Sequence, residues 1–197
     1  MDNEENLDFD ALTYGITEGG LRSTLEINLL ICYVVVNSKK RLTDKIIIDT
    51  MVEGEIANYF ETANALERLK KKQIIIENEE GYLLPGKNCK NLMDLVENDL
   101  PFTIRKKSIA LSAKLAVKEL YRKENSVETE KTEDGYRVTM HLKDLGRDFM
   151  SITLDLPTSA QADMVKEQFY NNPVKVYDAV LDALFKEDKE NAEDNDK

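Results

Sequence analysis

Hydrophobic residues recur at helical spacing through the first part of the chain. Ser23 and Glu26 stand three residues apart, the spacing of a capping box, and predict the start of a helix that ends at Asn37. Apolar residues cover most of the surface of this helix, so we expect it to be largely buried. A second, short helix is predicted next, with Thr43 or Asp44 as its N-cap.

A third helix and a hairpin follow. Over Asn58–Lys72 apolar residues recur at steps of three, which predicts an amphipathic helix. These residues are Phe60, Ala63, Leu66 and Leu69. The repeat then shortens to two residues in Gln73–Glu77, and Tyr82–Leu84 forms a returning strand. Three helices and a hairpin follow one another in winged helix-turn-helix domains, so we predict such a domain over residues 22–86. Glycine is commoner than glutamine where the third helix of such domains meets the first wing strand, so Gln73 departs from that pattern.

A long helix is predicted after the hairpin. Residues 87–124 are expected to form a helical linker, in which Pro101 suits a first helical position and the long helix runs from Phe102 to about Lys123. Linker helices that follow winged-helix domains often build dimers, so this segment is a candidate dimer helix.

The last part of the chain alternates between apolar and polar residues. Residues 125–185 are predicted to form an α+β domain, a three-stranded antiparallel meander with a hairpin turn at Asp134-Gly135. Two helices, Ser159–Tyr170 and Pro173–Phe185, are expected to cover its apolar face. The residues expected to point inward on the second of these helices are Val176, Val180 and Leu184. The whole chain is therefore predicted to be α+β.

Composition sets the broad class. With 197 residues, of which 42% are hydrophobic, the chain can build one large domain or two small ones. The polar lead-in at 1–21 and the charged tail at 186–197 are not expected to join a core, and the tail reads as disordered. No apolar run approaches the ~20 residues that span a bilayer. Cys32 is expected in the core and Cys89 nearer the surface, and the two lack metal-ligand spacing. We therefore expect a cytoplasmic protein with no membrane partner, metal or cofactor.

The third helix suggests a mechanism of DNA recognition, because the recognition helix of a helix-turn-helix protein lies in the major groove. On Asn58–Lys72, Asn64 and Arg68 are the residue types that read adenine and guanine edges, and Glu61 can accept from cytosine. Tyr59, near the helix start, can bond a phosphate. The expected phosphate contacts nearby are Lys39, Lys40, Arg41 and Lys45.

The charge of the same region argues against DNA. The 38 Asp and Glu of the chain against 27 Lys and Arg give a formal net charge of −11. Residues 1–86 hold 9 Lys and Arg against 16 Asp and Glu, and the hairpin turn carries Glu79 and Glu80. Two hypotheses therefore stay open. One is a transcription regulator that binds duplex DNA as a homodimer, and the other is an interaction module whose winged helix docks a protein partner. Exposure of Tyr59 or Phe60 would favour the protein partner.

Other charged residues yield weaker candidates. Lys107, Lys114, Lys118 and Arg122 fall on one narrow stripe of the long helix. This stripe is either a basic partner surface or a solvated face that balances nearby carboxylates. His141 is expected to be a solvated strand residue. Since a nucleophile, a base and an orienting group cannot be assembled from the one histidine and the two cysteines, no catalytic residue is predicted and the protein is not expected to be an enzyme.

Several short segments carry a family resemblance. They are Tyr14–Thr17, Gly19–Ser23, Glu26-Ile27, Leu29–Tyr33, Ala57–Glu61, Asp134–Tyr136, Gln161-Ala162 and Asn172-Pro173. Through them the chain, from about Leu12 to Phe185, resembles an uncharacterised family from Gram-positive anaerobic bacteria that is catalogued only as a domain of unknown function. The resemblance implies a winged-helix N-terminal half and the label of transcription regulator. It implies no activity, ligand or operator.

Overall fold

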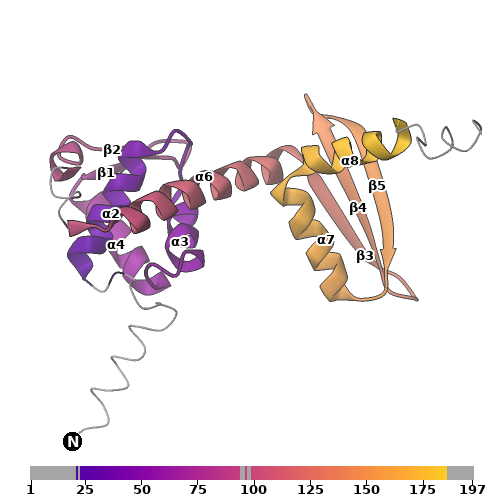
Figure 1. Cartoon of the computed structure of the whole chain (residues 1–197), viewed down its shortest axis with the longest axis horizontal. Helices are drawn as coiled ribbons and strands as arrows, with labels where there is room; N and C mark the ends of the chain where they lie inside the picture. Colours follow the sequence, from indigo (N-terminus) through magenta and orange to yellow (C-terminus); the bar gives the residue numbers. More distant parts are fainter. Residues whose placement is uncertain (1–20, 22, 94–95, 97–98, 186–197) are drawn as a thin grey trace, which may run out of the picture. The chain divides into compact units, whose positions relative to one another are not determined.

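The computed structural model describes residues 21, 23–93, 96 and 99–185. The predicted tail at 186–197 and all of the predicted lead-in except Leu21 lie outside the described residues. The chain divides into two compact units, Met1–Val117 and Lys118–Lys197. The described elements are helices and two antiparallel sheets, which confirms the α+β class (Figure 1).

In the first unit, three helices precede a two-stranded antiparallel hairpin (Figure 1). The elements are α2 (Thr24–Asn37), α3 (Asp44–Glu53), α4 (Tyr59–Lys71), β1 (Ile75–Glu77), β2 (Leu83–Pro85) and the 3-10 turn η1 (Lys90–Leu92). The succession of helices and hairpin is the one predicted from the hydrophobic pattern.

Side-chain caps begin all three of these helices. The Ser23 hydroxyl accepts the backbone N–H of Glu26, and the Glu26 carboxylate accepts the backbone N–H of Ser23, both at 3.2 Å. This confirms the predicted capping box. Thr43 caps α3 and Asn58 caps α4, each by accepting a backbone N–H three residues further on.

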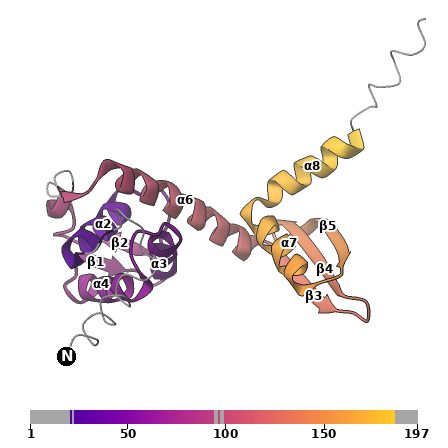
Figure 2. The same cartoon turned by 60° about the horizontal axis from the view of Figure 1, so that its bottom comes forward.

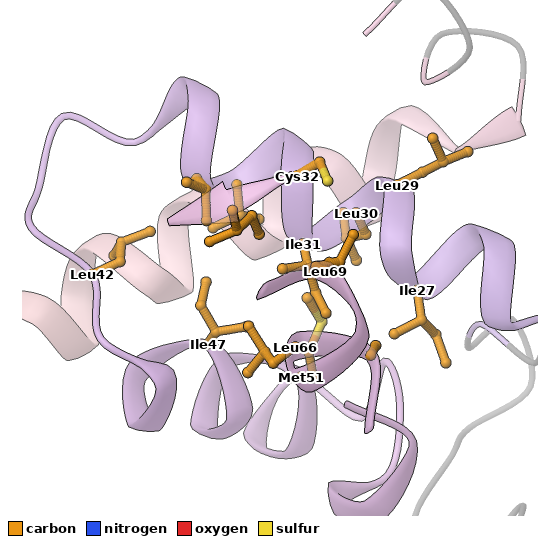
Figure 3. Packing of buried hydrophobic residues seen from close by; sticks show 14 of the residues in the cluster. Ile27, Leu29, Leu30, Ile31, Cys32, Leu42, Ile47, Met51, Leu66 and Leu69 are labelled. Atoms are coloured by element: carbon orange, nitrogen blue, oxygen red, sulfur yellow. The ribbon is translucent and has the colours of Figure 1, made fainter. Parts of the chain in front are cut away.

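The core of the first unit is built around α2. Seven residues of α2 are buried, and α4 packs against both α2 and α3. Figure 3 shows side chains of α2 and α3 converging on α4. Those labelled on α3 and α4 are Ile47, Met51, Leu66 and Leu69.

The buried stripe of α4 differs from the predicted one. Its buried residues are Thr62, Ala65, Leu66 and Leu69. Phe60, which the step of three assigned to the apolar face, is 73% exposed, so that prediction was wrong. At ~3.6 residues per turn, the nine residues from Phe60 to Leu69 make about two and a half turns, which places them on opposite sides of the helix.

Tight connections follow α3, α4 and β2. Gly54 ends α3, and a Cβ there would lie 2.5 Å from the Thr50 carbonyl oxygen. Gln73, between α4 and β1, has a left-handed φ of 53°. After β2, the backbone N–H of Gly86 donates to Ile74 O at 2.8 Å. A Cβ on Gly86 would overlap the Gln73 carbonyl, so glycine permits the hairpin to close against the start of β1.

Helix α6 (Phe102–Glu124) contains the division between the units. In its first part Ser108, Ser112, Leu115 and Ala116 are buried, and the last two belong to the core of the first unit. The apolar side of this part of α6 is therefore already covered by its own chain.

The second unit is a three-stranded meander with two helices. Its elements are β3 (Ser126–Lys131), β4 (Tyr136–Asp144), β5 (Arg147–Leu156), α7 (Ser159–Asn171) and α8 (Pro173–Phe185). The strands pair antiparallel in the order β3-β4-β5, which confirms the predicted sheet. α7 packs on one face, where Ala162 and Phe169 join Val138, Met140 and Leu142 in a second core.

Helix α8 is less buried than predicted. Pro173 is its one buried residue, Val176 and Val180 are partly buried, and Leu184 is 72% exposed. The prediction that Leu184 points inward was therefore wrong. Figure 2 shows the C-terminal part of α8 extending away from the strands. Among the described residues, no helix is both long and apolar enough to cross a bilayer.

Candidate functional site

The outer surface of α4 carries the predicted base-reading residues. Asn64 and Arg68 are exposed, four residues apart, and lie away from the buried stripe. Glu61 is partly buried, and its backbone N–H donates to Asn58 Oδ1 at 2.8 Å. These side chains are held on a helix whose opposite face is fixed in the core.

The start of α4 presents two aromatic rings. Tyr59 is 55% exposed and Phe60 is 73% exposed. Their rings meet edge to face, with centroids 5.5 Å apart. Together they form an aromatic pair that supplies apolar surface at the N-terminal end of the helix.

A groove of about 790 Å³ lies between the hairpin and the loop that follows α2. Lys39, Lys40 and Arg41 line it on the loop side, and Glu79 and Glu80 line it on the hairpin side. Arg41 forms an ion pair with Glu80 at 3.1 Å, and its guanidinium lies 5.2 Å from the centre of the Tyr82 ring. The groove therefore has cations along one wall, and on the other wall the Glu80 carboxylate is paired with Arg41.

The four predicted phosphate contacts differ in their surroundings. Lys45 binds Asp49 at 2.9 Å, one helical turn further along α3, and Arg41 is held by Glu80. Lys39 and Lys40 are exposed, and neither forms a salt bridge with any side chain in the described part of the chain. Lys39 and Lys40 are thus the members best able to meet an incoming anion.

Lys70 was not singled out from the sequence, although it joins three elements. Its ammonium lies 2.6 Å from Asp44 on α3 and 2.5 Å from Glu77 on β1. Burial lowers the pKa of Lys70, but hydrogen bonds to Asp44 and Glu77 outweigh it, and the pKa lies above its ordinary value. Its partners stand 26 and 7 residues away, so helical spacing could not have found them.

The predicted basic stripe on α6 is divided between two settings. In the first unit Lys107 and Lys114 are exposed. In the second unit Lys118 and Arg122 bind Glu167 on α7, at 2.9 and 2.6 Å. The hydrogen bond from Lys118, opposed by burial and aided by the charge of Arg122, holds the pKa of Glu167 below its ordinary range. Lys118 and Arg122 thus balance a carboxylate of their own unit.

His141 is more enclosed than predicted. Its side chain is 19% exposed, and Nδ1 lies 2.7 Å from Asp148 Oδ2 and 3.1 Å from Ser151 Oγ. A catalytic triad needs the acid and the hydroxyl on opposite ring nitrogens. Here both meet Nδ1, while Nε2 is buried without a partner among the described residues. The Ser-His-Asp cluster therefore lacks the geometry of a triad.

Both cysteines are buried, so the expectation that Cys89 lies nearer the surface was wrong. The Cys89 thiol donates toward Cys32 O at 4.0 Å. Interaction of the Cys32 thiol with the Cys89 side chain and burial both raise the pKa of Cys32 above its ordinary value. Across the part of the chain that the structure describes, no group of three His, Cys, Asp or Glu residues could hold a metal ion.

Comparison with known proteins gives one family and no individual relative. Comparison with curated proteins and comparison with solved structures each gave no match. One family model, described as the domain of unknown function DUF4364, matches residues 27–184 and thus covers both units of the fold. The chain belongs to the DUF4364 family.

Proposed function

We propose that residues 22–86 form a winged helix-turn-helix domain that binds duplex DNA, as part of a cytoplasmic, non-enzymatic transcription regulator. In this proposal α3 and α4 are the two helices of the motif, Gly54 lies in the turn, and β1 and β2 form the wing. Gln73 has a left-handed φ of 53°, a conformation that glycine adopts most easily. Because glycine is the commoner residue at this junction in winged helices, this φ supports the assignment.

The exposed face of α4 is the observation that carries the proposal. Asn64 can donate to and accept from an adenine edge, and Arg68 can bind a guanine with two parallel hydrogen bonds. Both side chains are exposed on a helix anchored through its other face. Tyr59 at the helix start can donate to a phosphate.

The acidity of the chain is concentrated away from this helix. Residues 21–117 contain 15 Lys and Arg against 13 Asp and Glu, whereas residues 1–20 contain 6 acids and no Lys or Arg. Within the hairpin, Glu77 and Glu80 are paired with Lys70 and Arg41. These pairs reduce the repulsion that the hairpin would exert on phosphates.

A homodimer follows from how such domains read DNA. One winged helix contacts few base pairs, and a two-fold protein matches a two-fold operator. We therefore propose that two copies of this chain bind the two halves of one operator.

A second candidate function rests on the aromatic pair Tyr59 and Phe60. Their exposure gives the start of α4 an apolar surface suited to docking a protein. The ion pairs of Arg41 and Lys45 also occupy two of the four expected phosphate contacts. In this alternative the same helix binds a basic or neutral protein.

Selection of bound fragments from random duplex DNA, followed by titration of the selected sequence at low salt, tests DNA binding. We expect R68A to lose ~1–3 kcal/mol of discrimination at one base pair. K40A should weaken binding to all sequences alike and reduce the slope of the logarithm of the binding constant against the logarithm of the salt concentration by about one. K131A, at an exposed lysine on β3 in the second unit, is the matched control and should bind as the wild type does. If no duplex binds at micromolar protein, the DNA proposal is wrong and the protein-docking function takes its place.

A further inference from the structure

We propose that the acidic segment 1–20 of this chain binds back onto the exposed start of α4 and competes with DNA for that helix. The competition rests on the proposed function, but the docking does not. The surface to be covered is the aromatic pair Tyr59 and Phe60, with Arg68 two helical turns further on.

The position at which the described chain begins brings the segment to this surface. Leu21 is buried at 3% exposure, and its backbone N–H donates to Ile56 O at 2.8 Å. Ile56 is itself buried and precedes Tyr59, the first residue of α4, by three positions. Leu21 is therefore held beside the turn that leads into α4.

The segment is long enough to follow the whole helix. An extended chain spans ~3.3 Å per residue, whereas the 13 residues of α4 rise ~20 Å. Leu7 and Phe9 stand 14 and 12 residues before Leu21, so the intervening chain is long enough to loop back to the start of α4 and to leave Asp2, Glu4 and Glu5 for the direction of Arg68. The segment and α4 belong to one chain, so docking is intramolecular. Because the connection is short, the effective concentration of the segment at α4 is in the millimolar range.

The composition of the segment complements the exposed surface of α4. It contains apolar residues, among them Leu7 and Phe9, that can cover the rings of Tyr59 and Phe60. Its acids are Asp2, Glu4, Glu5, Asp8, Asp10 and Glu18, and it has no Lys or Arg. Toward its C-terminal end α4 carries Arg68, which is exposed and forms no salt bridge among the described residues, whereas Lys70 and Lys71 are paired with carboxylates. An acidic, partly apolar strip therefore fits a helix that is aromatic at its start and basic at its end.

DNA and the segment would compete for the same helix because both are polyanions. A segment docked along α4 would cover Arg68 and set carboxylates where phosphates must approach. Substitutions that weaken docking of the segment should therefore raise the affinity of the protein for DNA, by about tenfold or more at low salt and by less at high salt.

The absence of tryptophan from the chain makes docking measurable in the full-length protein. F60W introduces a single tryptophan at the proposed contact. Two sets of substitutions, each made in the F60W variant, are designed to weaken docking of the segment. They are L7S/F9S and the neutralised form D2N/E4Q/E5Q/D8N/D10N/E18Q. We expect both to shift the emission to longer wavelength and to increase its quenching by acrylamide. The matched control is F102W, at a 67% exposed position in the first turn of α6, whose emission should not respond.

The outcomes separate the occupants of the surface. The proposal is wrong if neither set of segment substitutions changes the emission or the acrylamide quenching of F60W. Protection that appears only as protein concentration rises also overturns it, because a second copy would then be the occupant. If docking is observed and DNA binds, L7S/F9S, which leaves the net charge unchanged, must bind DNA more tightly, and an unchanged affinity refutes the competition. If no form binds DNA, the proposed function fails while the fluorescence still decides whether the segment docks.

Discussion

Arg41 and Glu80, 39 residues apart in the sequence, form an ion pair of 3.1 Å between the loop after α2 and the turn of the β1–β2 hairpin. The side chains are 73% and 63% exposed, so water and salt screen their attraction. The pair therefore contributes little to stability. Its larger effect is on charge, because it neutralises a carboxylate at the tip of the proposed wing.

Replacing Glu80 by Gln separates these two effects. We expect E80Q to change the free energy of unfolding by less than about 1 kcal/mol, as for other exposed ion pairs. The same change frees Arg41 and removes a negative charge, so affinity for duplex DNA should rise. Urea unfolding and fluorescence anisotropy measure the two quantities. E53Q, at an exposed acid on α3, is the control for a general loss of negative charge, and an equal gain in both variants contradicts the specific role of Glu80.

Lys70 is expected to contribute much more to stability than its neighbour Lys71. K70M leaves Asp44 and Glu77 without their shared cation at a position where the lysine side chain is 24% exposed. We expect a loss of ~1–3 kcal/mol in the free energy of unfolding. K71M breaks an exposed pair with Glu67 in the same helix and should cost no more than ~0.5 kcal/mol. Equal losses for the two variants in urea unfolding would show that Lys70 does not join the three elements.

The pH dependence of the second unit is expected to reveal Glu167. Its pKa is lowered in the folded state, so its ion pairs stabilise that state above the ordinary pKa of about 4.5. That contribution is lost as the pH falls through the lower, folded value. E167Q should therefore be less stable than the wild type at pH 7, by about 1 kcal/mol given the partly exposed carboxylate. In strong acid the two should converge. Urea unfolding at several pH values measures this, and a constant difference would contradict the assignment.

Local sequence patterns predicted the parts of the fold that depend on neighbouring residues. The capping box of Ser23 and Glu26, the N-cap of α3, for which Thr43 was one of two candidates, and the alternation that forms the meander all involve residues a few positions apart. The candidate face of α4 could also be predicted from the sequence, because Asn64 and Arg68 lie one helical turn apart.

Errors arose where distant contacts decide the outcome. Steps of three placed Phe60 on the apolar face, but packing against α2 and α3 selects the stripe that includes Thr62. Cys89 gave no local sign of burial, because its cover comes from the core around Cys32. Glu167 became a partner of Lys118 only through the packing of α7 near the end of α6, which no spacing along one helix encodes.

The burial of both thiols predicts slow chemistry. Because the pKa of Cys32 is raised, its reactive thiolate is scarce at neutral pH. We expect Ellman's reagent to label neither Cys32 nor Cys89 rapidly in native buffer and to label both in urea. A thiol of the native protein that reacts as fast as free cysteine would show that its part of the core opens readily.

The proposed dimer is expected to depend on α8 more than on α6. The apolar residues Leu115 and Ala116 of α6 are already covered by the first core, whereas Leu184 and Phe185 of α8 are 72% and 77% exposed. Burying two such side chains between copies can stabilise association by several kcal/mol, at ~1.5–3 kcal/mol each. L184S/F185S should therefore shift the protein toward monomer in sedimentation velocity. F102S/L120S, which removes two exposed apolar residues of α6, is the matched comparison and should leave the dimer intact. The opposite result would return the interface to the helix that the sequence pattern favoured, and a wild-type monomer at high micromolar concentration would exclude both.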